Sequence, residues 1–264
     1  MTKIEQNEIK RIVSFGCSFT AGDELLDHLL PEDIYNLRLK CKSYSEWYNL
    51  ISKDKVAYQK FQIIREKAKN HTYGKFLADL LNKDYLNLAL SGNSNQHILY
   101  QIEQFYQSGY RPGDYILVGL TYPTRVLEFK PELNETRYHL LQYLDNKEVV
   151  KWHNNDRIIF DHLRDLQCLG FYKHKCFDNL LSIVKIWSTK SIFKDLFVDE
   201  FVDNDNRKTF QKTFFDLHNS DLFIQNSFAF TNIENPRRLH FGHMPEDLHR
   251  EFAQDLYKYF TGAQ

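Results

Sequence analysis

The feature that most constrains the fold is an alternation of short apolar runs and helical periods in the first 120 residues. The apolar runs are rich in β-branched and aromatic residues, which is typical of buried strands, and the segments between them have the apolar spacing of helices. This βαβαβ order predicts an α/β fold with a mainly parallel sheet, and right-handed crossovers bring the carboxyl ends of the strands to one edge. The predicted strands cover 11–15, 85–89 and 114–120, and the predicted helices cover 72–82 and 95–108.

The first predicted strand ends in a turn that contains a serine. Gly16 and Gly22 enclose this turn and allow the backbone to change direction sharply. Because ligands bind at the carboxyl ends of the strands in such sheets, Ser18 is a candidate nucleophile. The alternative is an ordinary strand-to-helix turn in which Ser18 is the N-cap of a helix. We interpret the neighbouring Cys17 as a small buried packing residue.

The next two strand ends also carry candidate site residues. The second strand enters a Gly/Asn/Ser turn that contains Gly92 and Asn93, and the third strand ends at Thr121. Since all three strands are expected to be parallel, Ser18, Gly92 and Thr121 should lie at the same edge of the sheet. Arg125 follows shortly after, where it either binds an anionic or carbonyl-bearing substrate or forms a surface ion pair.

A histidine near the other end of the chain complements this edge. His243 lies in a loop with Gly242, directly before a segment with helical apolar spacing. A histidine on such a loop can be both fixed in place and exposed. It is therefore the candidate general base for Ser18. The helical period is carried by Phe252, Ala253, Leu256, Tyr257 and Phe260.

The early strand-turn serine and the late loop histidine resemble, in their order, the blocks of the SGNH (GDSL-like) hydrolase family. The resemblance spans nearly the whole chain by its blocks, with a divergent middle. It implies a three-layer α/β/α fold with a flavodoxin-like sheet, a Ser18 nucleophile and a His243 base that meet over the sheet. It also implies that Gly92 in block two helps to hold an oxyanion. Asn93, in the same turn, and Arg125 are further candidate binding residues.

Two positions depart from the pattern of this family. Thr121 stands at the position of the family's oxyanion asparagine, and its shorter side chain can donate one hydrogen bond. Phe241 and His240 stand where the family carries the aspartate that orients its histidine. The alternatives are a Ser-His dyad steered by a backbone carbonyl, a carboxylate from elsewhere, or an inactive site. The acids nearest these blocks in sequence are Asp23, Glu246 and Asp247.

Two long segments separate the recognisable blocks. Residues 23–70 form a charged, aromatic insertion after the nucleophile turn, with helical spacing from 45 to 69. We interpret it as a lid or wall over the site or, alternatively, as a helical decoration that buries its own aromatic residues. In the divergent region 126–220 we predict a helix over 178–188, and a late strand follows at 222–224.

Composition restricts the class of protein. The chain is 42% hydrophobic and, at 264 residues, long enough for a single domain over 1–264. Its formal net charge of −1 argues against binding of nucleic acid or an anionic membrane. No apolar run is long enough to span a membrane and residues 1–10 lack a signal segment, so we expect a cytoplasmic protein, or one associated with a larger particle. The four cysteines suggest no disulfide framework, and Cys168, His174 and Cys176 are a weak candidate metal site.

The resemblance implies a serine esterase or deacylase that acts on a small ester or an O-acylated carbohydrate and requires no metal or organic cofactor. Two alternatives belong to other classes: an inactive SGNH-fold protein that binds a partner or serves a structural role, and a small-molecule binding protein that retains only the cleft. The sequence gives no prediction of the oligomeric state.

Overall fold

The computed structural model describes residues 9–93, 95–119, 128–130, 135–137, 181–184 and 238–262. At its centre is a four-stranded parallel sheet, in which β1 lies between β2 and β3, as in flavodoxin-like folds. The three predicted strands and their parallel arrangement are confirmed. The order across the sheet is β2 (Asp84–Asn87), β1 (Arg11–Gly16), β3 (Asp114–Gly119) and β6 (Leu181–Val184).

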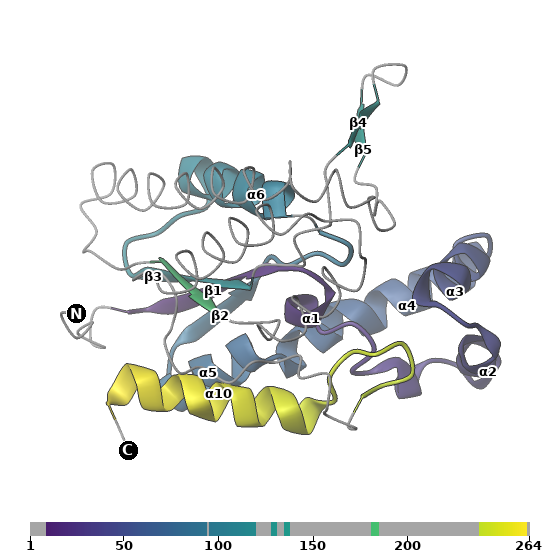
Figure 1. Cartoon of the computed structure of the whole chain (residues 1–264), viewed down its shortest axis with the longest axis horizontal. Helices are drawn as coiled ribbons and strands as arrows, with labels where there is room; N and C mark the ends of the chain where they lie inside the picture. Colours follow the sequence, from purple (N-terminus) through teal and green to yellow (C-terminus); the bar gives the residue numbers. More distant parts are fainter. Residues whose placement is uncertain are drawn as a thin grey trace, which may run out of the picture.

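Helices cover both faces of the sheet (Figure 1). The helices α5 (Tyr73–Leu81) and α10 (Glu246–Thr261) pack on one face, and α6 (Asn95–Ser108) packs on the other. Successive side chains of β1 divide between the two layers, so that Ile12 packs with α5 and α10 while Val13 packs with α6. Because neighbouring side chains of a strand point to opposite faces and both faces are covered by helices, the odd-numbered and the even-numbered side chains must both be apolar here. The fold is therefore the expected three-layer α/β/α arrangement.

One prediction for this sheet is wrong. The helix predicted over 178–188 is contradicted by strand β6, which pairs in parallel with β3. The four residues of β6, of which Ile183 and Val184 are β-branched, form a short run, and periodicity alone does not distinguish such a run from a buried helix. Its place beside the fully buried strand β3 accounts for the extended conformation. The strand predicted at 222–224 lies outside the described residues.

A helical insertion follows the first strand, after the short helix α1 (Ser18–Ala21). Figure 1 shows its helices standing together beside α1, away from the layers that cover the sheet. Ser43 and Asp54 cap two of them, since their side chains accept hydrogen bonds from backbone N–H groups of the first turn. The insertion consists of η1 (Asp27–Leu29), α2 (Glu32–Lys40), α3 (Tyr44–Ile51), α4 (Lys55–Ala68) and η2 (Lys69–His71).

The insertion has a small hydrophobic core of its own. Trp47 and Phe61 are fully buried at its centre, with 5.0 Å between their ring centroids. Phe241, from the loop before α10, packs against this core. The insertion is therefore joined to the loop that carries His243. The other buried members of this core are Leu30, Ile34, Cys41, Ile51 and Ala57.

A separate antiparallel pair is formed by β4 (Glu128–Lys130) and β5 (Glu135–Arg137). Apart from these strands and β6, the divergent region 126–220 lies outside the described residues. In the part of the chain that is described, no helix is long and apolar enough to cross a membrane.

Candidate active site

Ser18 lies where the chain leaves the carboxyl end of β1. It is the first residue of α1, and Cys17 occupies the N-cap position without a side-chain capping bond. The alternative interpretation of Ser18 as an N-cap is therefore wrong. The helix ends at Gly22, whose φ is +82°, and the backbone N–H groups of Gly22 and Asp23 both donate to the Ser18 carbonyl. Cys17 is buried in the core below α5 and α10.

Gly16 is required by the close approach of β1 to its neighbours. It pairs with Gly119 of β3, and a Cβ atom at position 16 would lie 2.3 Å from Thr20 Oγ1 and 2.9 Å from the Gly119 carbonyl oxygen. The Gly16 carbonyl accepts hydrogen bonds from the Leu90 backbone N–H at 3.1 Å and from Asn93 Nδ2 at 3.0 Å. The turn that carries Ser18 is thus tied to the turn after β2.

Asn93 holds the turn that contains Gly92. Its buried side chain donates to the Gly16 carbonyl and to Gln101 Oε1, at 3.0 and 2.7 Å, so both amide hydrogens are used within the protein. His97 Nδ1 donates to Asn93 Oδ1. Gly92 has a φ of +76°, which glycine adopts without the strain of other residues. We therefore expect Asn93 to fix the position of Gly92 through its side chain rather than to bind a ligand with it.

His243 lies on a tight loop before α10. The Leu239 carbonyl accepts a hydrogen bond from the Gly242 N–H at 2.9 Å, and the Leu239 N–H donates to the His243 carbonyl at 2.8 Å, so the loop closes on itself. The imidazole ring lies against Phe19, with 4.9 Å between the ring centroids. The structure therefore brings His243 to the short helix that begins with Ser18.

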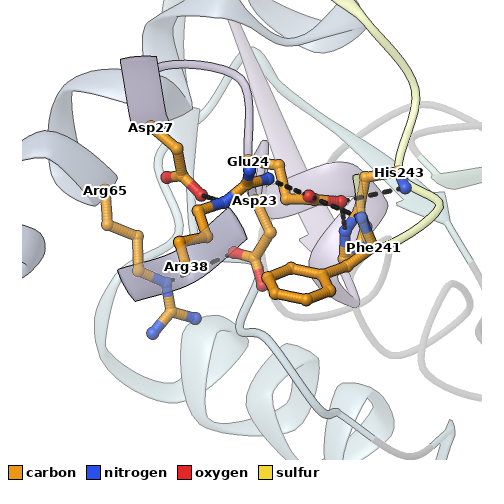
Figure 2. A network of polar contacts seen from close by, with 7 residues as sticks. All are labelled: Asp23, Glu24, Asp27, Arg38, Arg65, Phe241 and His243. Atoms are coloured by element: carbon orange, nitrogen blue, oxygen red, sulfur yellow. Dashed lines mark hydrogen bonds and ion pairs between the residues drawn. The ribbon is translucent and has the colours of Figure 1, made fainter. Parts of the chain in front are cut away.

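The carboxylate beside His243 belongs to Glu24, six residues after Ser18 (Figure 2). Glu24 Oε2 accepts hydrogen bonds from His243 Nδ1 at 2.6 Å and from the His243 backbone N–H at 3.1 Å. Glu24 Oε1 accepts from the Phe241 backbone N–H at 2.8 Å and from Arg38 Nη2. These four donors match the acceptor capacity of one carboxylate. Because three of them come from the loop of His243, Glu24 fixes both the ring and the backbone that carries it.

This contact sets the tautomer of the imidazole. An ionised carboxylate only accepts hydrogen bonds, so we assign the proton of a neutral His243 to Nδ1. The lone pair is then left on Nε2, as a general base requires. Although Ser18 and His243 are both described, no hydrogen bond joins their side chains. Such catalytic bonds are often long without substrate and shorten only in the reacting complex.

Glu24 is adapted to this role by its backbone and its surroundings. Its φ is +71°, which is uncommon outside glycine, and residues held in this way concentrate at functional sites. Burial alone raises the pKa of Glu24, but hydrogen bonding to His243, the charge of His243 and the two backbone N–H groups lower it below its ordinary value. The carboxylate therefore stays ionised at neutral pH.

A buried network of charges surrounds Glu24 (Figure 2). Arg38 pairs with both Glu24 and Asp27, with 2.8 Å between Arg38 Nε and Asp27 Oδ2, and Arg65 pairs with Asp23 at 3.3 Å. Burial raises the pKa of Asp27 to about 6, against the opposing charge of Arg38. Above that pH, three carboxylates face two guanidinium groups. With a neutral imidazole the network has one negative charge in excess, which complements an imidazolium at His243.

The sequence leaves open three alternatives at His243: a backbone carbonyl, a carboxylate from elsewhere in the chain, or an inactive site. In the structure, a carboxylate from elsewhere, that of Glu24, contacts His243. It is none of the three acids nearest the blocks: Asp23 pairs with Arg65, and Glu246 pairs with His71 and Arg250. Only the position of Glu24 just after the nucleophile turn could have indicated it. His240, the neighbouring histidine, contacts the Cys41 carbonyl through Nε2 at 3.2 Å.

Other candidate residues lie outside the described part of the chain. These are Thr121 and Arg125 of the predicted site, together with Cys168, His174 and Cys176 of the weak metal candidate. Within the residues that the structure does describe, no group of three or more His, Cys, Asp or Glu side chains is placed to hold a metal ion.

Known proteins match this chain only in structure. Neither protein-family models nor curated proteins match the sequence. One similar solved structure is a member of the lipolytic protein G-D-S-L family from Veillonella parvula, with 16% identity and a TM-score of 0.46 over 96% of this chain and 98% of that one.

Two other similar structures are larger proteins. One is a carbohydrate esterase family 2 enzyme with a carbohydrate-binding domain from Corynascus thermopiles, with 13% identity and a TM-score of 0.48 over 96% of this chain and 66% of that one. Another is an acetyl xylan esterase from the rumen bacterium Butyrivibrio proteoclasticus, with 13% identity and a TM-score of 0.42 over 96% of this chain and 63% of that one.

Proposed function

We propose that this protein is a serine esterase or deacylase in which Ser18 is the nucleophile, His243 the general base and Glu24 the acid that orients the base. The observation that carries the proposal is the hydrogen bond between His243 Nδ1 and Glu24 Oε2, at 2.6 Å, on a loop packed against α1. A carboxylate, an imidazole and a serine in this order form the arrangement that activates a hydroxyl for acyl transfer. The parallel sheet supports it by bringing the strand ends to one edge.

In the proposed reaction, Ser18 Oγ attacks the ester carbonyl while His243 Nε2 takes its proton. The imidazolium is stabilised by Glu24, and the oxyanion by the backbone N–H groups of Ser18 and Gly92 and the hydroxyl of Thr121. Collapse of the tetrahedral intermediate expels the alcohol, which receives the proton from His243. Water then hydrolyses the acyl-enzyme by the same sequence of steps, and these steps use no metal or organic cofactor.

The proposed substrate is a small ester or an O-acylated carbohydrate. The support for an acyl group is the chemistry of the site, whereas the support for a sugar is the resemblance of the sequence blocks to SGNH hydrolases. An aromatic side chain near the base is compatible with a sugar substrate, since the ring centroids of Tyr44 and His243 are 6.0 Å apart. Arg125 is the proposed binding residue for an anionic or carbonyl group on the substrate.

The test is hydrolysis of p-nitrophenyl acetate by wild type, Ser18→Ala and His243→Ala, with His240→Ala as the matched control. We expect both active-site variants to lose turnover by several orders of magnitude, as in other serine hydrolases. His240→Ala should retain most of the activity, because its ring bonds the Cys41 carbonyl and not the Glu24 carboxylate. Equal activity in wild type and Ser18→Ala would contradict the proposal.

A protein that has lost its chemistry is the competing interpretation. It predicts no hydrolysis by a correctly folded wild type, together with thermal stabilisation by an acylated sugar without turnover. One feature that favours this alternative is the absence of an acid just before His243, and the contact of His243 Nδ1 with the Glu24 carboxylate weakens that support.

A further inference from the structure

We propose that Arg38, on α2 of the insertion, is a positioning residue that holds Glu24 against His243, so that the insertion is a working part of the active site. This inference rests on the proposed function. Arg38 is 3% exposed, and its guanidinium bridges two carboxylates: Nη2 donates to Glu24 Oε1, and Nε donates to Asp27 Oδ2 at 2.8 Å. The bridge fixes the one oxygen of Glu24 that does not contact the imidazole.

Arg38 also contacts the loop of the base directly. Its guanidinium carbon lies 4.9 Å from the centroid of the Phe241 ring and 5.8 Å from that of Tyr35. The Phe241 backbone N–H donates to the same Glu24 oxygen that Arg38 contacts. Arg38 therefore touches the acid and the segment that the acid holds, and a guanidinium stacked on an aromatic ring is fixed in its orientation.

The electrostatics explain why a cation is needed at this position. Without Arg38, the buried carboxylates of Glu24 and Asp27 lie close together without their shared counter-charge, and one of them must take a proton or move toward water. The pKa of Asp27 is already raised, so the proton goes to Asp27, and Glu24 Oε1 is left without the side-chain donor that fixes it. The Glu24 carboxylate can then turn away from the loop, and the ring of His243 loses the acceptor that sets its tautomer.

A second buried ion pair offers a matched control. Arg65, on α4 of the same insertion, pairs with Asp23 and lies beside the Phe61 ring, with 5.9 Å between its guanidinium carbon and the ring centroid. Its bonds do not involve Glu24. Replacing Arg65 disturbs the packing and charge of the insertion as replacing Arg38 does, but leaves the Glu24 bridge in place.

The experiment compares Arg38→Met and Arg65→Met in the 264-residue chain by ester hydrolysis and by NMR of the His243 Nδ1 proton. We expect Arg38→Met to lower kcat about 10–100-fold with little change in KM, as happens when partners that orient metal-binding histidines are removed. The downfield Nδ1–H signal, present in the wild type, should disappear in Arg38→Met. Arg65→Met should keep the signal and lose clearly less kcat than Arg38→Met, because the bridge from Arg38 to Glu24 stays in place.

Three results would overturn the inference. The first is a wild-type kcat and a preserved Nδ1–H signal in Arg38→Met. The second is an equal loss in Arg65→Met, which would indicate a general effect on the insertion. The third concerns Arg38→Lys, which replaces Arg38→Met if that variant does not fold. A lysine carries a point charge and cannot bridge two carboxylates as a planar guanidinium does, so a wild-type kcat and Nδ1–H signal in Arg38→Lys would also overturn the inference. A wild type without hydrolysis would refute the proposed function, while the NMR signal would still decide the role of Arg38.

Discussion

Glu24 adopts a backbone conformation that few residues other than glycine adopt, and its carboxylate has its acceptor positions filled by donors. These two features support each other, because a strained backbone persists only where the surrounding contacts over-determine it. In the SGNH pattern that the sequence resembles, the orienting acid precedes the histidine. At the scale of single residues, the carboxylate at His243 Nδ1 instead belongs to Glu24, which follows Ser18.

Glu24→Gln tests this replacement. The amide cannot accept the Nδ1 proton and the loop N–H groups as a carboxylate does, so we expect kcat to fall on the order of 10³–10⁴-fold, as when the acid of a Ser-His-Asp triad is neutralised. Glu24→Asp, which keeps the charge on a shorter side chain, should lose less. Steady-state kinetics on both variants measure this, and a Glu24→Gln enzyme with near-wild-type kcat would contradict the role of Glu24.

The candidate site could be predicted in part. Ser18 and His243 are marked by their turn and loop, since glycines beside a strand end and before a helix leave a signal in the sequence. Glu24 is marked only by its position shortly after Ser18, because its contact with His243 depends on a rare φ and joins residues 219 positions apart. In the sequence, nothing distinguishes Arg38 from the other charged residues around it, so its contact with Glu24 could not be predicted.

At the scale of elements, the turns after β1 and β2 act as one unit. Asn93 joins them, since its amide donates to the Gly16 carbonyl next to the nucleophile turn and to Gln101 on α6. An alternation of strands and helices predicts that these ends meet, but side-chain bonds set their spacing. The insertion shows the same division: its helical spacing is visible in the sequence, whereas the hydrogen bonds of Glu24 with the loop of His243 are not. Its role as a lid stays a prediction.

Asn93→Ala should loosen this unit. The Gly16 carbonyl loses a buried donor and the Gln101 amide oxygen loses another, so we expect about 1–3 kcal/mol of destabilisation. Turnover should fall as well, because Gly92 is no longer held in place. Gln101→Ala is the control, since it leaves the bond between Asn93 and Gly16. Denaturant unfolding and steady-state kinetics measure the two effects, and equal kcat values in wild type and Asn93→Ala would show that the turn is not catalytic.

At the scale of the whole molecule, buried histidines make stability depend on pH. His249 on α10 is buried against α5, where its Nδ1 accepts the Tyr73 backbone N–H at 3.2 Å. Burial, with a smaller effect from His243, lowers the pKa of His249 to about 3, and burial lowers that of His97 to about 4. Asp27 acts in the opposite sense: with its pKa raised to about 6, its contribution to stability is present in acid and lost as the pH rises through 6.

The contribution of His249 can be isolated with His249→Gln, whose amide oxygen can still accept from Tyr73. A lowered pKa means that stability is present above the ordinary histidine value and lost as the pH falls toward about 3. Between pH 6.5 and 4.5 the free energy of unfolding of the wild type should therefore fall relative to His249→Gln by up to about 1.4 kcal/mol per pH unit. Parallel curves for the two proteins in denaturant titrations would show that His249 is not buried in its neutral form.

The most direct test of the account is labelling with a fluorophosphonate, followed by peptide mapping. The account predicts one modified residue, Ser18, with no labelling of Ser18→Ala and much slower labelling of Glu24→Gln, because a serine reacts only when its base is correctly oriented. A folded wild type that is not labelled, or a label on another residue, would contradict the claim that Glu24 and His243 activate Ser18.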